Sequence, residues 1–212
     1  MIDIISMLDL TILKTDATEK DVVKLCEDAK ENGCAAVCVN PFFVSLAKWL
    51  LEGSDVKVCT VVGFPLGAST KEVKAFEAKQ AIKDGAQEID MVLNVGALKN
   101  KNYDIVGKDI EAVAKVCKNK AVLKVIIETC LLDDEEKKIA SQIVVQAGGQ
   151  YVKTSTGFST GGATAEDVKL IRKTVGSDAK IKASGKVRDY ETAIAMIEAG
   201  ADRIGSSSLI RK

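Results

Sequence analysis

The chain of 212 residues contains no histidine. Histidine is the side chain that most often acts as a general base near neutral pH, and it is the commonest zinc ligand. Its absence argues against zinc-dependent enzymes. Any acid–base chemistry in this protein must therefore use lysine, aspartate, glutamate, cysteine or tyrosine.

The chain also lacks an excess of charge of either sign, because 30 basic residues are balanced by 30 acidic ones. Such a surface has no overall field to attract nucleic acid or an anionic membrane, and we expect neither as a partner. No apolar run approaches the roughly 20 residues that a membrane span needs, and the first ten residues carry Asp3 and Asp9 without a basic leader segment. We expect a cytoplasmic protein.

The six cysteines are scattered among apolar neighbours and include no Cys-x-x-Cys pair. A chain of this size does not depend on disulfides for its stability. We expect reduced thiols that mostly fill the core.

Short apolar runs alternate with longer amphipathic segments, a pattern typical of repeated strand–helix units around a parallel sheet. Eight such runs are present, at 7–9, 35–39, 57–62, 88–93, 123–127, 151–154, 180–183 and 203–206. A doubly wound sheet would more often have five or six strands and a glycine fingerprint in its first turn, which is missing here. The sequence therefore predicts a single α/β domain over residues 1–212, a (β/α)8 TIM barrel whose last helix, at 209–212, is short.

Four helix starts are predicted where Ser, Thr or Asp precedes an acidic residue by three positions. These pairs are Thr18 with Asp21, Ser69 with Glu72, Asp133 with Glu136, and Thr164 with Asp167.

In a TIM barrel the functional site lies at the carboxyl ends of the strands, and two lysines fall there. Lys153 in the sixth run and Lys182 in the seventh alternate with the apolar Val152 and Ile181, so both should point into the barrel. Because these two strands are neighbours, the lysines should lie about 5 Å apart.

The same alternation directs Asp90 inward, since Ile89 belongs to the apolar face, and it places Asn94 on the same side as Asp90. A carboxylate inside a barrel needs a partner or a function. Two other polar residues also fall near strand ends. Asp9 is equally compatible with a turn or capping role, and Cys38 is more simply read as a buried, inert thiol.

Two adjacent lysines and a carboxylate can generate a lysine nucleophile. A free lysine, with a pKa of about 10.4, is neutral in about one molecule in 2,500 at pH 7. A second ammonium group about 5 Å away opposes protonation by roughly 3 kcal/mol at an effective dielectric constant of about 20, which is about two pKa units. One lysine can then be neutral near pH 7 and form a Schiff base with a carbonyl compound, while Asp90 keeps the other charged.

Five segments in the same order resemble the deoxyribose-phosphate aldolases, a family of class I aldolases: Asp9–Thr11, Glu88–Gly96, Lys153–Gly157, Lys182–Gly185 and Gly205–Ser208. The resemblance runs along nearly the whole chain. It implies cleavage of 2-deoxy-D-ribose 5-phosphate to acetaldehyde and D-glyceraldehyde 3-phosphate, with neither a metal nor an organic cofactor.

The resemblance also implies roles for individual residues. Lys153 becomes the Schiff-base nucleophile, Lys182 the charge that activates it, and Asp90 the partner of Lys182 and a proton shuttle through water. Substrate contacts are implied at Asp9, Cys38 and Thr156. The phosphate is expected in a nest of backbone amides and hydroxyls backed by helix N-termini, at Gly157, Gly185, Val187, Gly205, Ser207 and Ser208.

The sequence departs from the family pattern after Gly185, where the family usually has a second glycine and this chain has Lys186. A side chain with φ above zero costs about 1 kcal/mol, whereas an ammonium that reaches the phosphate contributes about 1 to 3 kcal/mol. We therefore predict that Lys186 binds the phosphate. The alternatives are a solvent-facing Lys186 and a contact from Arg188. The printed chain ends at Lys212, before the tyrosine-ended tail of some relatives, so we expect no proton transfer from such a tail.

Two other functions remain open at this point. One is another Schiff-base barrel aldolase or a transaldolase, and the other is a phosphosugar-binding barrel without turnover. Paired inward lysines argue against a transaldolase, whose single lysine works with acidic partners, and three inward charges argue against loss of turnover. The expected partners are a phosphosugar and acetaldehyde. The sequence leaves the oligomeric state open, including a homo-oligomer such as a dimer or tetramer.

Overall fold

Eight parallel strands form a closed barrel in the computed structural model, which describes residues 3–210. Each strand pairs with the next along the chain, and β8 pairs with β1. The strands are β1 Leu8–Ile12, β2 Ala36–Val39, β3 Lys57–Val62, β4 Glu88–Val92, β5 Val122–Ile126, β6 Tyr151–Lys153, β7 Lys180–Ser184 and β8 Arg203–Ser206. The predicted (β/α)8 barrel is thereby confirmed.

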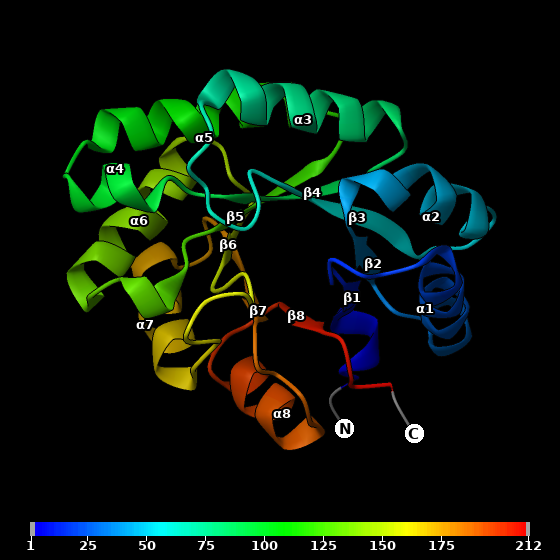
Figure 1. Ribbon diagram of the computed structural model, residues 1–212. Helices are drawn as coiled ribbons and strands as arrows, with labels where there is room; N and C mark the ends of the chain where they lie inside the picture. Colours follow the sequence, from blue (N-terminus) through cyan, green and yellow to red (C-terminus); the bar gives the residue numbers. More distant parts are fainter. Residues whose placement is uncertain (1–2, 211–212) are drawn as a thin grey trace.

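Within the described residues, α-helices surround the strands on the outside of the barrel (Figure 1). They are α1 Glu19–Asn32, α2 Val44–Leu50, α3 Lys71–Lys83, α4 Val95–Lys99, α5 Tyr103–Cys117, α6 Asp134–Gln146, α7 Ala165–Val175 and α8 Tyr190–Glu198. Two helices, α4 and α5, follow β4. None of the described helices is long and apolar enough to cross a membrane.

The short C-terminal helix predicted at 209–212 is not seen in its described part. Leu209 and Ile210 form a turn after β8, and residues 211 and 212 lie outside the described residues. The described chain therefore has no helix after its last strand.

Three of the four predicted helix starts are confirmed. Thr18 and Asp133 form capping boxes at α1 and α6, and the Thr164 hydroxyl accepts a hydrogen bond from the Asp167 N–H at α7. The fourth is wrong by one residue. Thr70, not Ser69, caps α3, because the extended backbone of Thr70 lets its hydroxyl accept from the N–H three residues on.

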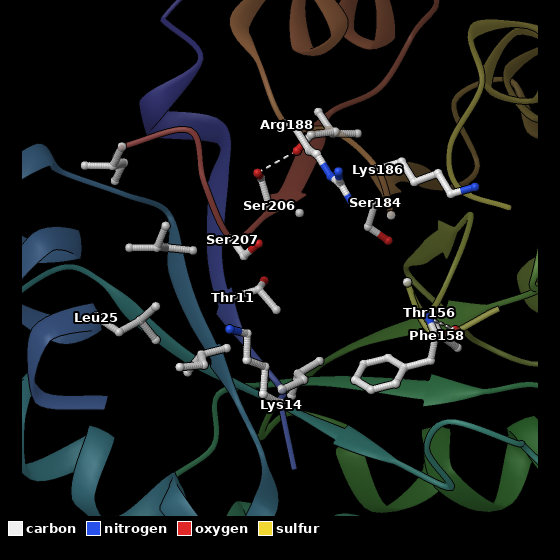
Figure 2. A pocket seen from close by; sticks show the side chains of 18 of the residues that line it. Thr11, Lys14, Leu25, Thr156, Phe158, Ser184, Lys186, Arg188, Ser206 and Ser207 are labelled. Atoms are coloured by element: carbon white, nitrogen blue, oxygen red, sulfur yellow. Dashed lines mark hydrogen bonds between the residues drawn. The ribbon is translucent and has the colours of Figure 1, made fainter. Parts of the chain in front are cut away.

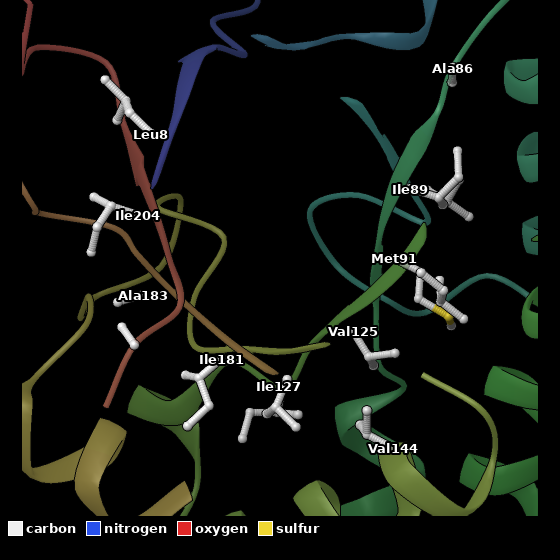
Figure 3. Close-up of a cluster of buried hydrophobic side chains, with 14 of the residues drawn as sticks. Leu8, Ala86, Ile89, Met91, Val125, Ile127, Val144, Ile181, Ala183 and Ile204 are labelled. Carbon is white, nitrogen blue, oxygen red and sulfur yellow. The ribbon is translucent and has the colours of Figure 1, made fainter. Parts of the chain in front are cut away.

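The main apolar core lies between the sheet and the helices (Figure 3). Ile89 and Met91 of β4 and Val125 of β5 point outward from the barrel, and Val125 faces Val144 of α6. Inside the barrel a separate apolar cluster is much smaller and lies near β1, β2 and β3: Leu13, Ala36, Cys38, Cys59 and Val61. Much of the remaining interior is filled by charged side chains.

Candidate active site

Lys153 and Lys182 lie side by side inside the barrel, as predicted. They are register partners in the pairing of β6 with β7, and their exposed fractions are only 3% and 1%. Lys153 is the last residue of β6, which places its side chain at the carboxyl end of the barrel.

Asp90 connects these two lysines. Its Oδ2 atom accepts hydrogen bonds from both the Lys153 and the Lys182 Nζ atoms, each at 2.7 Å. Its Oδ1 atom accepts from the Lys124 Nζ at 2.8 Å and from the Cys59 thiol at 3.2 Å. The prediction that Asp90 pairs with Lys182 is therefore incomplete, since the carboxylate contacts three lysines. Burial alone would raise the pKa of Asp90, but the attraction of the three ammonium groups outweighs it and holds this pKa well below its usual range.

Lys124 is a third inward lysine that the sequence analysis missed. It is the register partner of Asp90 in the pairing of β4 with β5, it is fully buried, and its Nζ lies 2.6 Å from Glu88 Oε2. Burial lowers its pKa, but Asp90 and the other acidic groups around it raise the value well above that of a free lysine. The signal was present in the sequence, because Lys124 alternates with the outward-facing Leu123 and Val125.

Asp9 lies deeper in the barrel than predicted. The strand that was expected to end at this residue continues to Ile12, so Asp9 is the second residue of β1 and is fully buried. Its Oδ2 accepts from the Lys182 Nζ, and its Oδ1 lies 2.5 Å from NH1 of Arg203, a residue that the sequence analysis did not single out. Burial raises the pKa of Asp9, but Lys182, Lys124 and Arg203 outweigh this effect and lower it.

Asp9 and Asp90 together determine the charge of Lys182. Burial lowers the Lys182 pKa, but the Coulombic attraction of Asp9 and then of Asp90 raises it above that of a free lysine. Lys182 therefore remains an ammonium group at neutral pH.

A cavity of about 510 Å³ opens above Lys153 and Lys182. Figure 2 shows side chains from the β1 loop and α1 on one side of it, and from the loops after β6, β7 and β8 on the others. Nine of the predicted site residues line the cavity: Lys153, Thr156, Gly157, Lys182, Gly185, Lys186, Val187, Gly205 and Ser207. Four predicted residues are not part of its wall: Asp9, Cys38, Asp90 and Ser208.

The loops after β6, β7 and β8 offer hydrogen-bond donors to an anion. Among the residues described, no acceptor is found for the backbone N–H groups of Gly157, Gly185, Val187 and Ser207. The Arg188 guanidinium points toward Ser184 in the view of Figure 2. Ser208 does not join this set, because its N–H donates to Ser206 Oγ and its hydroxyl donates to the Arg188 carbonyl.

Lys186 has the backbone conformation that was predicted for it, with a φ of 62°. Its Nζ donates to the Thr160 carbonyl at 2.7 Å, and Figure 2 shows the side chain directed away from Ser206 and Ser207. In this structure the Lys186 ammonium therefore binds the loop after β6 through the Thr160 carbonyl. Figure 2 shows the Arg188 side chain closer than that of Lys186 to Ser206 and Ser207.

Two other predicted inward residues have different surroundings. Cys38 is fully buried in β2 opposite its register partner Cys59, below the cavity. The prediction for Asn94 is wrong, because β4 ends at Val92 and the Asn94 side chain caps α4, accepting from the Ala97 N–H at 3.0 Å.

Two groups of buried side chains have donor atoms close enough together to hold a metal ion: Cys38 with Cys59 and Asp90, and Asp9 with Cys59 and Glu88. The absence of histidine therefore does not leave the described part of the barrel without possible metal ligands. Both clusters include a carboxylate that is already paired with the ammonium group of Lys124. A divalent cation would be repelled by that ammonium at short range.

The model of the DeoC/LacD family aldolases matches residues 4–210 of this chain. The chain belongs to this family. It is 64% identical over 97% of its length to a deoxyribose-phosphate aldolase from Geobacillus sp. (strain WCH70), of which it covers 92%. It is 60% identical over 99% of its length to a deoxyribose-phosphate aldolase from Clostridium tetani (strain Massachusetts / E88), of which it covers 97%.

Solved structures agree with this assignment of a DeoC/LacD family aldolase. The fold is similar to that of QR15, an aldolase, with a TM-score of 0.94 and 47% identity over 99% of this chain and 94% of the other. It is also similar to the tetrameric deoxyribose phosphate aldolase from Aeropyrum pernix, with a TM-score of 0.90 and 34% identity over 97% of this chain and 87% of that one.

Proposed function

We propose that this aldolase reversibly cleaves 2-deoxy-D-ribose 5-phosphate into D-glyceraldehyde 3-phosphate and acetaldehyde through a Schiff base on Lys153. The observation that carries the proposal is the position of Lys153 at the floor of the cavity, beside Lys182 and within 2.7 Å of Asp90. The relatives that are about 60% identical and named deoxyribose-phosphate aldolase support the same reaction.

In the proposed reaction the neutral Lys153 amine attacks the C1 aldehyde, and loss of water gives the imine. The protonated imine then accepts the electrons of the C2–C3 bond as this bond breaks. The C3 hydroxyl loses its proton and becomes the aldehyde of glyceraldehyde 3-phosphate. Protonation of the remaining enamine and hydrolysis release acetaldehyde and return the lysine. No metal or organic cofactor takes part.

Three residues around Lys153 have distinct roles in this proposal. Lys182 supplies the fixed positive charge, and its contacts with two carboxylates keep it protonated. Asp90 lies within hydrogen-bond reach of both lysines, so it can relay protons through water in the cavity. Lys124 holds the second oxygen of Asp90 and fixes the direction of the first.

Thr156 is proposed to contact the sugar, and the phosphate is proposed to bind the free N–H groups of the loops after β6, β7 and β8. Those N–H groups belong to Gly157, Gly185, Val187 and Ser207, with Gly205 and the Arg188 guanidinium beside them. Asp9 and Cys38 act from below the cavity, through Lys182 and through Cys59. Lys186 and Ser208 position the loops.

We further propose that residues 1–212 act as one catalytic domain in the cytoplasm, in the breakdown of deoxyribonucleotide sugars. Free thiols at all six cysteines support a reducing compartment. A homo-oligomer is supported by three large apolar side chains that are more than two thirds exposed: Phe42 in the turn before α2, Trp49 of α2 and Phe76 of α3. Sedimentation of the wild type and of Trp49→Glu tests whether these side chains form a contact between subunits.

Borohydride reduction in the presence of acetaldehyde, followed by peptide mapping, tests the proposed function. We expect an ethyl group on Lys153 and on no other lysine, because Lys182, the other buried lysine that lines the cavity, is held as an ammonium by Asp9 and Asp90. An adduct on Lys182 would reverse the two lysine roles, and the absence of any adduct would refute the Schiff-base mechanism.

A further inference from the structure

Glu128 is a buried carboxylate in an unusual backbone conformation directly after β5. Its exposed fraction is 3%, and its φ of 56° lies in the left-handed region. For a residue other than glycine this conformation costs about 1 to 2 kcal/mol, and it persists only where the surroundings fix it. None of the roles in the proposed mechanism uses this side chain.

The backbone on either side of Glu128 is fastened to the end of β6. The Ile127 N–H donates to the Lys153 carbonyl at 3.0 Å, and the Thr129 N–H donates to the Thr154 carbonyl at 2.9 Å. Between these two bonds, the Glu128 carboxylate reaches the loop that follows the Schiff-base lysine. The strained residue is thus held in place from both sides.

The Glu128 carboxylate binds Thr156 by both its hydroxyl and its backbone. The Thr156 hydroxyl donates to Oε2 at 2.5 Å, and the Thr156 N–H lies 3.2 Å from Oε1. The Phe158 N–H in turn donates to Thr156 Oγ1 at 3.1 Å. Figure 2 shows Thr156 and Phe158 close together on one wall of the cavity.

These contacts leave Thr156 Oγ1 with a single free hydrogen-bonding position. A hydroxyl has one proton and two lone pairs, and here the proton is committed to Glu128 and one lone pair to Phe158. The remaining lone pair can only accept a hydrogen bond. A ligand group that approaches Thr156 from the cavity must therefore be a donor, such as a hydroxyl.

We infer that Glu128 is a positioning residue that fixes Thr156 as an acceptor for a hydroxyl of the substrate, and that the site thereby selects 2-hydroxyaldehydes among phosphorylated aldehydes. This inference rests on the proposed function, since the aldehyde in question is the one that the Lys153 enamine attacks in the synthetic direction. The 2-hydroxyl is the one hydroxyl that glyceraldehyde 3-phosphate carries.

The test compares two aldehydes in the addition of acetaldehyde: D-glyceraldehyde 3-phosphate, and 3-oxopropyl phosphate, which lacks the 2-hydroxyl. Glu128→Gln keeps the shape of the side chain, but its NH2 group must face one of the two Thr156 donors. The threonine hydroxyl then turns to accept from this NH2 group, and its own proton is released toward the cavity. Glu136→Gln is the control, because Glu136 caps α6 through the Asp133 N–H.

We expect Glu128→Gln to lower kcat/KM about tenfold for glyceraldehyde 3-phosphate, mainly through KM, and to change it less than twofold for 3-oxopropyl phosphate. The control should change neither value. An equal loss with both aldehydes would overturn the inference, because it would mean a general effect on the Lys153 loop.

Two variants of Thr156 keep the inference testable if Glu128→Gln does not fold. Thr156→Val should abolish the preference for the hydroxylated aldehyde, and Thr156→Ser should retain it. If Glu128→Gln does fold, its combination with Thr156→Val should be no worse than Thr156→Val alone. If the wild type forms the Lys153 adduct but Thr156→Val keeps the wild-type preference for the hydroxylated aldehyde, the inference is refuted. A wild type without that adduct would instead refute the proposed function.

Discussion

Replacement of Asp90 by asparagine removes the one carboxylate that contacts three buried lysines. In the wild type the barrel interior holds the basic side chains Lys124, Lys153, Lys182 and Arg203 and the carboxylates Asp9, Glu88 and Asp90. Asp90→Asn keeps the size of the side chain, but it removes one negative charge from this buried cluster.

We expect a large decrease in the free energy of unfolding, because these charged groups are buried away from water. Removal of one partner from a buried ion pair destabilises a protein by about 3–5 kcal/mol, since the other charge is left uncompensated. Three lysines share the loss here, so we expect the upper part of this range, out of a total stability of about 5–15 kcal/mol.

The pH dependence of this loss has a definite sign. In the wild type Lys124 and Lys182 have raised pKa values, so their contribution to stability is fully present below the unfolded pKa of about 10.4 and is lost only as the pH rises through the folded values. Without Asp90 the pKa values of both lysines fall, and the lysines release protons at a lower pH, which relieves the repulsion. The difference between wild type and variant should therefore be smaller near pH 9.5 than near pH 7.

Urea unfolding of both proteins near these two pH values measures the difference directly. Asp104→Asn is the matched control, because it breaks an ion pair with Lys108 in which both side chains are more than half exposed, and it should leave the midpoint unchanged. If Asp90→Asn lowers the free energy of unfolding by less than about 1 kcal/mol, or by the same amount at both pH values, other groups must compensate the charges of the buried lysines.

Four further outcomes are expected. Lys153→Arg should fold normally but form no borohydride-stable adduct and show no turnover, because guanidinium keeps the charge and cannot form the imine. Lys182→Met should move the rise of activity with pH to higher pH, and an unchanged profile would mean that burial alone activates the nucleophile. Lys186→Gly should lower kcat/KM severalfold and equally for 2-deoxyribose 5-phosphate and 2-deoxyribose, since its ammonium binds Thr160; a selective loss with the phosphorylated sugar would restore the phosphate role predicted from the sequence. EDTA should leave activity unchanged, and loss with rescue by Zn²⁺ would refute the metal-free mechanism.

The adjacency of Lys153 and Lys182 was predictable because it depends only on strand alternation and on consecutive strands being neighbours. Both conditions are local or topological, and the register of β6 with β7 bears them out. Lys124 was predictable on the same grounds. It lies within β5 as the register partner of Asp90, which the alternation along β4 did predict to point inward.

Other features depend on three-dimensional contacts that no sequence pattern shows. The depth of Asp9 follows from the continuation of β1 to Ile12, and strand boundaries are the least certain part of any reading of a sequence. The attachment of Lys186 to Thr160 joins residues 26 positions apart. The left-handed conformation of Glu128 is stabilised by its contacts with Thr156, and glutamate has no intrinsic preference for it.

The ion cluster inside the barrel also bears on how the chain can fold. Its members come from the first strand, the last strand and four strands between them: Asp9 of β1, Glu88 and Asp90 of β4, Lys124 of β5, Lys153 of β6, Lys182 of β7 and Arg203 of β8. An open sheet without β8 would leave Asp9 without its Arg203 partner, and one without β1 would deprive Lys182 of its Asp9 partner. Partly closed barrels would therefore lose part of the charge compensation within the cluster, which disfavours them as populated intermediates and makes the closure of β1 onto β8 a cooperative step.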